Sequence, residues 1–221
     1  MTAALADRAR HAARSWRDTA ELRVSADPAD VESVTVRYLM YVLMPAWFVP
    51  GIADYVMHRR TRIERTSGLR ESAIHSLMMA EVAVPVTLTL LCEVNPLLLA
   101  VTAAALGVHE GTAIWDVRAA VDGGRQVRPA EQHIHSFLES LPFMAASALL
   151  CLHWDQIQRV RRHPGDRQAW RLRLRRRRLP GRYLAGIAAG IAGLVAVPYA
   201  EELWRCARDR RERGPRSLGV I

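Results

Sequence analysis

Charged and apolar residues are separated along this chain into long alternating blocks. The charges are concentrated in residues 1–37, 59–70, 157–182 and 205–216, and the runs between these blocks carry almost none. A soluble helical domain would mix both classes within each helix, so that every helix has one apolar face. Segregation on this scale instead predicts an all-α, polytopic membrane protein whose first partner is the lipid bilayer.

The basic character of the chain has two readings. Arg supplies all 31 basic positions, and the formal net charge is +9. Arg blocks beside apolar runs are typical of topology signals or lipid-headgroup contacts. The aromatic residues that a single-strand binder would interleave with them are missing. We therefore expect no nucleic-acid partner.

Four expected spans form the core of the prediction. A bilayer requires about 20 predominantly apolar residues per helix, and each of these runs approaches that length. The expected spans are Tyr38–Met57, Ser72–Cys92, Leu97–Val117 and a run from Pro129 to about Leu152. They make residues 36–156 a four-helix transmembrane bundle, preceded by a polar arm (1–35) and followed by a basic connection (157–182).

A fifth apolar run, Tyr183–Ala200, begins the last segment, residues 183–221. It contains no charge and no residue type that binds metals, so we interpret it as a packing helix followed by a charged tail. Gly186, Gly190 and Gly193 would allow another helix to approach closely, which favours a homo-oligomer contact on this face.

Carboxylates and histidines recur at helical spacing inside these runs. Three pairs lie four residues apart and one pair lies seven apart, so the two members of each pair share a helix face. Tight turns make neighbouring helices antiparallel, which brings the four pairs toward one end of the bundle. The predicted metal ligands are Asp54, His58, Glu71, His75, His109, Asp116, Glu131 and His135.

This ligand set predicts the kind of metal. Each buried charge costs about 2.5–3.5 kcal/mol in a membrane helix, and a divalent cation would compensate the carboxylates. Imidazole and carboxylate without thiolate suit Fe or Zn, with Mn as a further candidate. The number of ligands indicates a dinuclear site, and their spread over several layers leaves room for a third ion. Glu81, Glu110 and Glu139 are candidates for proton transfer.

Several functions stay open at this point. The site favours a metal-dependent enzyme that oxidises or hydrolyses a lipid-like substrate. A divalent-metal transporter or sensor is the first alternative. A structural protein is the second, either with a stabilising metal or with carboxylates paired to Arg59, Arg60 or Arg118. The residues alone do not establish that the chain is an enzyme.

Two kinds of resemblance accompany these patterns. The ligand placement partly resembles that of membrane di-metal hydroxylases and desaturases, but the partner at four-residue spacing here is Asp or Glu instead of His, so no catalytic residue is carried over. The stretches 54–60 and 131–139 are similar to an uncharacterised group of small bacterial polytopic membrane proteins with a His/carboxylate-rich helix bundle. That resemblance implies a multi-pass location in the bacterial inner membrane.

Overall fold

Helices dominate the computed structural model, which describes residues 27–124 and 127–213. No β-strand occurs among these residues, so the prediction of an all-α chain is confirmed for them. Most of the expected N-terminal arm, residues 1–26, and the end of the tail, residues 214–221, lie outside the described part of the chain.

The chain divides into two compact units, residues 1–38 and 39–221. Helix α2 (Pro28–Tyr38) is the described part of the first unit. The second unit contains the long helices α4 (Phe48–Thr61), α5 (Gly68–Leu91), α6 (Pro96–Asp122), α7 (Pro129–Leu152), α9 (Gly181–Ile191) and α10 (Val197–Arg213). Its shorter elements are η2 (Leu39–Leu43), α3 (Met44–Ala46), η3 (Ile63–Arg65), α8 (Trp154–Arg162), η4 (Arg167–Trp170) and η5 (Ala192–Ala196).

The turns between the long helices are short and have local causes. Arg62 ends α4 in the left-handed conformation, at φ 54°, and Gly68 opens α5 at φ +61°. Asn95 caps α6, because its side chain accepts a hydrogen bond of 2.9 Å from the amide of Leu98, and Pro96 occupies the first helical position. These turns set consecutive helices antiparallel.

Two π-helical segments lie just ahead of prolines. Segment η2 ends two residues before Pro45, and η5 ends two residues before Pro198. Proline removes a backbone donor and clashes with the preceding turn, and a widened π turn accommodates both effects without ending the helix. The second π turn therefore lets the helical path continue from α9 into α10.

Five helical runs are long and apolar enough to cross a membrane: Ala29–Thr61, Gly68–Leu91, Pro96–Asp122, Pro129–Leu152 and Gly181–Arg213. Their exposed surface is unusually apolar. Val49, Val108 and Phe143 are all more than half exposed, whereas Asp54, His58 and other charged residues are buried. Helices that face lipid are expected to bury their polar groups and to expose apolar ones.

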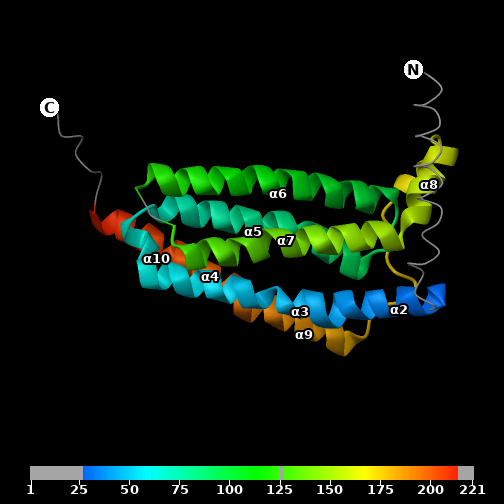
Figure 1. The fold of residues 1–221 in the computed structure, drawn as a ribbon, viewed down its shortest axis with the longest axis horizontal. Helices are drawn as coiled ribbons and strands as arrows, with labels where there is room; N and C mark the ends of the chain where they lie inside the picture. The colour runs from blue at the N-terminus through cyan, green and yellow to red at the C-terminus, as the bar shows by residue number, and fades with distance from the viewer. Residues whose placement is uncertain (1–26, 125–126, 214–221) are drawn as a thin grey trace, which may run out of the picture. The chain divides into compact units, whose positions relative to one another are not determined.

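Helices α4 to α7 lie side by side, and α10 passes beside α4 and α5 (Figure 1). The sequence prediction ended the fifth apolar run at Ala200, but the helix continues to Arg213. At Gly190 a Cβ atom would come within 2.7 Å of the Phe48 ring, so this glycine allows close packing onto α4 within the chain. The expected homo-oligomer contact through Gly186, Gly190 and Gly193 stays a prediction.

The basic connection folds back onto the turn between α5 and α6. Glu93 donates its amide to the carbonyl of Arg173, and the amide of Arg175 donates to Leu91. Farther back, Asp166 caps η4, and hydrogen bonding from Arg159 holds the pKa of the Asp166 carboxyl below its usual value. These hydrogen bonds hold the described basic connection against the turn between α5 and α6.

Two glycine substitutions test the turn that opens α5. A Cβ atom meets nothing within 4 Å at either Gly68 or Gly107, so only backbone conformation separates the two positions. We expect Gly68→Ala to destabilise the protein by about 1–2 kcal/mol, since φ there is left-handed. Gly107→Ala, inside α6, should be stabilising by up to about 1 kcal/mol. Thermal unfolding in detergent measures both, and equal shifts would contradict the assignment of Gly68.

Candidate metal centre

A first group of ligand atoms joins α4 to α7. Asp54 and His58 lie on the last turns of α4, and Glu131 and His135 lie on the first turns of α7. One ligand atom from each of these four residues lies within 4.8 Å of the others. Asp54 Oδ1 is 3.0 Å from His135 Nε2 and 3.4 Å from His58 Nε2. Four ligands of these types at such distances can hold one transition-metal ion.

A second group lies between α4 and α5. His58, Glu71 and His75 each place a ligand atom within 4.8 Å of the others, and all three residues are buried. The imidazole rings of His58 and His75 are stacked with centroids 4.7 Å apart. Asp116 of α6 reaches the same place, because its carboxylate oxygens lie 3.2 Å from His75 Nε2. Asp116 thus adds a third helix, α6, to this group.

His58 belongs to both groups and is completely buried. Its Nδ1 lies 2.9 Å from Glu202 Oε2. An ionised carboxylate only accepts hydrogen bonds, so we assign the proton of His58 to Nδ1. The lone pair of Nε2 then faces Asp54 Oδ1 at 3.4 Å and Glu131 Oε1 at 3.7 Å. Three electron-rich atoms that face one another call for a cation between them.

Glu202 is the residue that the sequence analysis missed. It was assigned to a charged tail, yet it is completely buried in α10. Its second oxygen lies 3.5 Å from His75 Nδ1, so one carboxylate contacts both stacked histidines. A carboxylate that orients a ligand histidine is the usual second layer of a metal site. The fifth helix is therefore part of the site as well as a packing element.

Tyr199, one turn before Glu202, is also buried at the centre. Its hydroxyl lies 3.0 Å from Asp54 Oδ2 and 3.3 Å from the carbonyl oxygen of Gly51. The contact holds the Asp54 oxygen that His135 does not contact. Pro198 and the π turn before it set the direction in which α10 presents this tyrosine.

The hydrogen bonding of the buried groups fits a bound cation. Within the described residues, His58 Nε2 and Asp116 Oδ1 are buried without a hydrogen bond. Natural proteins leave few buried polar atoms in that state, and a metal ion is one of the partners that satisfy them. The donor set of imidazole and carboxylate, without a thiolate, matches Fe, Zn or Mn.

Arginines do not provide the compensating charge around Asp54. Arg59 pairs with Glu201 at 2.9 Å, and its side chain is half exposed. Arg205 pairs with Glu64 and Glu201, away from the buried histidines. Arg60 and Arg118 are exposed. The alternative in which arginines neutralise the buried carboxylates therefore lacks support from these four side chains.

His109 was predicted to be a ligand, but it lies apart from both groups. Its Nδ1 faces Glu81 Oε2 at 3.3 Å, and Thr112 donates a 2.8 Å hydrogen bond to the other oxygen of Glu81. Of the candidates for proton transfer, Glu81 is thus paired with a histidine, Glu139 is half-buried and Glu110 is exposed.

A small cavity of about 40 Å³ adjoins both groups. It is large enough for a few water molecules. Its lining includes Asp54, His75, His109, Asp116, His135, Glu139 and Tyr199. Carboxylates and histidines from the first and second groups thus line one pocket together with Glu139.

Metal counting tests the shared role of His58. We expect His58→Ala to lose both ions, because Nε2 is a ligand in the first group and the ring, stacked on His75, positions the second. His135→Ala should retain the ion at Glu71 and His75, and His75→Ala should retain the ion at Asp54 and Glu131. His133→Ala is the control, since His133 is exposed on the same helix as His135. Elemental analysis of each purified variant gives the ratio of metal to protein, and equal losses in His58→Ala and His135→Ala would contradict the sharing.

Glu202 and its neighbour Glu201 form a matched pair of variants. Glu202→Gln keeps the side-chain size but removes the charge that orients His58 and His75, and we expect metal affinity to fall about 10–100-fold. Glu201→Gln should leave the affinity unchanged, because Glu201 contacts Tyr55, Arg59 and Arg205 outside the buried groups. Competition with a chelator of known affinity measures both, and a similar loss in both variants would remove Glu202 from the site.

No protein-family model, no curated protein and no solved structure matches the chain. The resemblance to small bacterial membrane proteins therefore stays a prediction. The argument for function rests on the buried His/Asp/Glu groups and the apolar helices around them.

Proposed function

We propose that the protein is an integral membrane metalloenzyme that holds two transition-metal ions between its helices. One buried feature carries the proposal: His58 belongs to two ligand groups that together draw on α4, α5 and α7. Two ions in adjoining sites are the simplest occupants of that arrangement, with Nε2 of His58 facing one of them and its ring stacked on His75 of the other. Asp54, His58, Glu131 and His135 would hold one ion, and Glu71 and His75 the other, with Asp116 as a further ligand.

The chemistry depends on which metal binds. Bound iron would supply oxidation with dioxygen, and bound zinc would supply activated water for hydrolysis. The chain itself contributes orientation and proton handling. Glu202 holds His58 and His75, and Tyr199 holds Asp54. Glu139 lines the small cavity and is placed to accept or return a proton there.

The surroundings of the site favour an enzyme over a transporter. An ion path would need polar groups that continue away from the two ligand groups. Beyond His109 and Glu81 the interior is instead a cavity lined mainly by apolar side chains such as Val82, Leu106 and Leu149. Such a lining suits an apolar substrate and opposes the passage of an ion.

The five apolar helices support a multi-pass membrane location, and we assign it to the bacterial inner membrane as the resemblance implies. The substrate would then reach the site from the lipid phase. We also retain the homo-oligomer contact as a proposal, restricted to Gly186 and Gly193, where a Cβ atom would meet nothing within 4 Å.

The proposal predicts stoichiometric metal and a stability that depends on it. Protein purified in detergent should contain about two ions of Fe, Zn or Mn per chain, because the structure has two ligand groups. Removal with a chelator should lower the unfolding temperature. Restoring free metal to 100 times its dissociation constant should return about 2.7 kcal/mol per site. The proposal would be overturned if the protein contained no stoichiometric metal and if neither Fe, Zn nor Mn stabilised it.

The metal found then decides which reaction to assay. Iron directs the assay to dioxygen consumption with apolar substrates, and zinc directs it to the release of hydrolysis products. A purely structural metal would give His58→Ala a lower unfolding temperature but no loss of either activity. Loss of activity together with the metal, at a temperature where the variant is folded, distinguishes the enzyme.

A further inference from the structure

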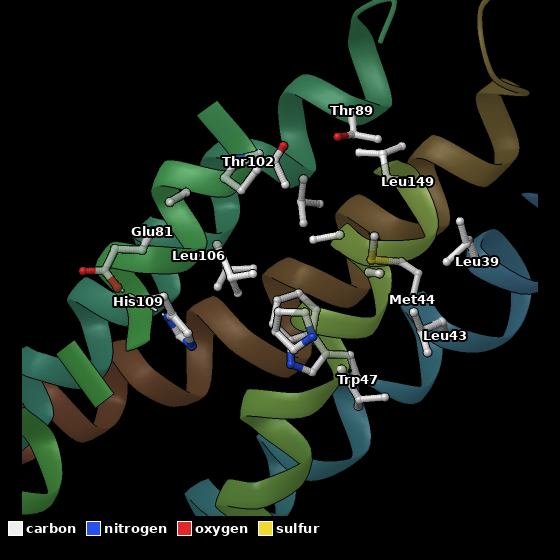
Figure 2. Close-up of a pocket in the computed structure, with 18 residues that line it drawn as sticks. Leu39, Leu43, Met44, Trp47, Glu81, Thr89, Thr102, Leu106, His109 and Leu149 are labelled. Atoms are coloured by element: carbon white, nitrogen blue, oxygen red, sulfur yellow. Dashed lines mark ion pairs between the residues drawn. The ribbon is translucent and has the colours of Figure 1, made fainter. Parts of the chain in front are cut away.

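A second, larger cavity lies deeper in the bundle than the ligand groups. It has a volume of about 140 Å³ and is bounded by α5, α6, α7 and the segment from η2 to the start of α4. Most of its lining is aliphatic, with Leu39, Leu43, Leu106 and Leu149 among the residues labelled in Figure 2. Its volume is close to that of a cavity of about 150 Å³ that holds a benzene-sized molecule.

Polar groups enter this cavity mainly at one side. Figure 2 shows Glu81 and His109 close together there, away from Leu39 and Leu43. Both side chains are more than nine-tenths buried. Thr112 occupies Glu81 Oε1, whereas Glu81 Oε2 and His109 Nδ1 have no hydrogen bond among the described residues. These two atoms lie 3.3 Å from each other, so Glu81 orients the ring of His109 and leaves its other nitrogen, Nε2, for a molecule in the cavity.

The same side of the cavity adjoins the metal centre. His109 and Trp47 line both the large cavity and the small one. The small cavity is also lined by Asp54, His75 and Asp116 of the ligand groups. A molecule in the large cavity with its polar end at His109 would therefore present that end to the centre.

We propose that the large cavity binds an alkyl chain with an uncharged hydroxyl end, which Glu81 and His109 hold beside the metal centre. The inference rests on the proposed function for its chemistry and names the substrate class of that site. The chain would lie along the aliphatic lining. The hydroxyl would donate to Nε2 of His109, whose ring Glu81 holds through Nδ1.

The polar pair, more than the aliphatic lining, determines what binds. Lipid tails are as apolar as leucine, so a chain gains little by moving from the bilayer into the cavity. A buried polar pair is different, since an occupant without a hydrogen-bonding end leaves Nε2 of His109 unsatisfied. A fatty carboxylate would in addition place its negative charge against Glu81. These effects favour an alkanol over an alkane or a fatty acid of equal length.

Photolabelling of the metal-loaded protein tests the binding. The probe is a medium-chain alkanol with a diazirine on its chain, applied to the full-length protein in detergent, and labelled peptides are mapped by mass spectrometry. We expect saturable labelling of peptides from α6 and α7 that include Ala105 and Ala146, which line the cavity. Unlabelled alkanol should protect these peptides better than an alkane. Labelling spread over the outer helix faces without protection would overturn the proposal.

Ala105 and Ala104 provide the matched variants. Ala105 lines the cavity, whereas Ala104 is exposed on the outer face of the same helix. We expect Ala105→Leu to reduce saturable labelling about tenfold by overpacking the site, and Ala104→Leu to leave it unchanged. Metal content, measured in parallel, should be equal in the two variants. Equal labelling of both variants would also overturn the proposal.

The polar end is tested by replacing Glu81 and His109 together. In the double variant Glu81→Met, His109→Phe the preference for alkanol over alkane as protecting agent should disappear, and a preserved preference would reject the role of this pair. The metal measurement separates the two proposals. Metal without saturable labelling would refute the chain-binding cavity and leave the metalloenzyme standing. Saturable labelling of protein that binds no metal would refute the metalloenzyme and leave the cavity standing.

Discussion

The arrangement of the helices depends on how buried negative charge is neutralised. Asp54, Asp116 and Glu202 are buried among apolar helices, and their partners are histidines. Moving an ionised carboxylate out of water costs several kcal/mol even after the surroundings relax, so an unpaired set would not stay buried. His58 carries its proton on Nδ1 toward Glu202 and directs Nε2 toward Asp54 and Glu131, which leaves a demand for positive charge at the centre. A divalent cation meets that demand from one point, which explains why ligands from several helices converge.

Local features of the backbone bring these ligands together. The short turn after α4 puts its carboxyl end beside the amino end of α5. The turn after α5 reverses the chain, so that Asp116, near the carboxyl end of α6, returns to the level of Glu71 and His75. Pro198 would ordinarily disrupt a helix, but the π turn of η5 absorbs it and α10 continues. That continuation places Tyr199 and Glu202 against Asp54 and His58. A helix broken at Pro198 would leave both residues outside the site.

Much of this could be predicted from the sequence, and the failures have physical causes. The apolar runs indicated the helices, and the four-residue spacing of Asp54 with His58 indicated a shared face. His109 shares a helix face with Asp116 and lies about 10 Å deeper, as the spacing indicated. The sequence did not show that its partner would be Glu81 on the neighbouring helix instead of either ligand group. Glu202 was missed because a charged residue after a proline looked like the start of a tail. Its position four residues before the apolar Cys206, on a helix that could continue, was the available signal.

Polarity changes in steps along the interior of the second unit, and this order has a functional meaning. At the outer end, exposed pairs such as Arg59 with Glu201 are solvated and contribute little to stability. Next come the buried ligand groups, where every charge needs a specific partner. The Glu81–His109 pair follows, and the aliphatic cavity lies beyond it. A pathway for ions would need polar groups at both ends. The interior instead becomes apolar in one direction. The proposed metal centre lies on the polar side, and the aliphatic cavity lies on the apolar side. The Glu81–His109 pair lies at the boundary between them.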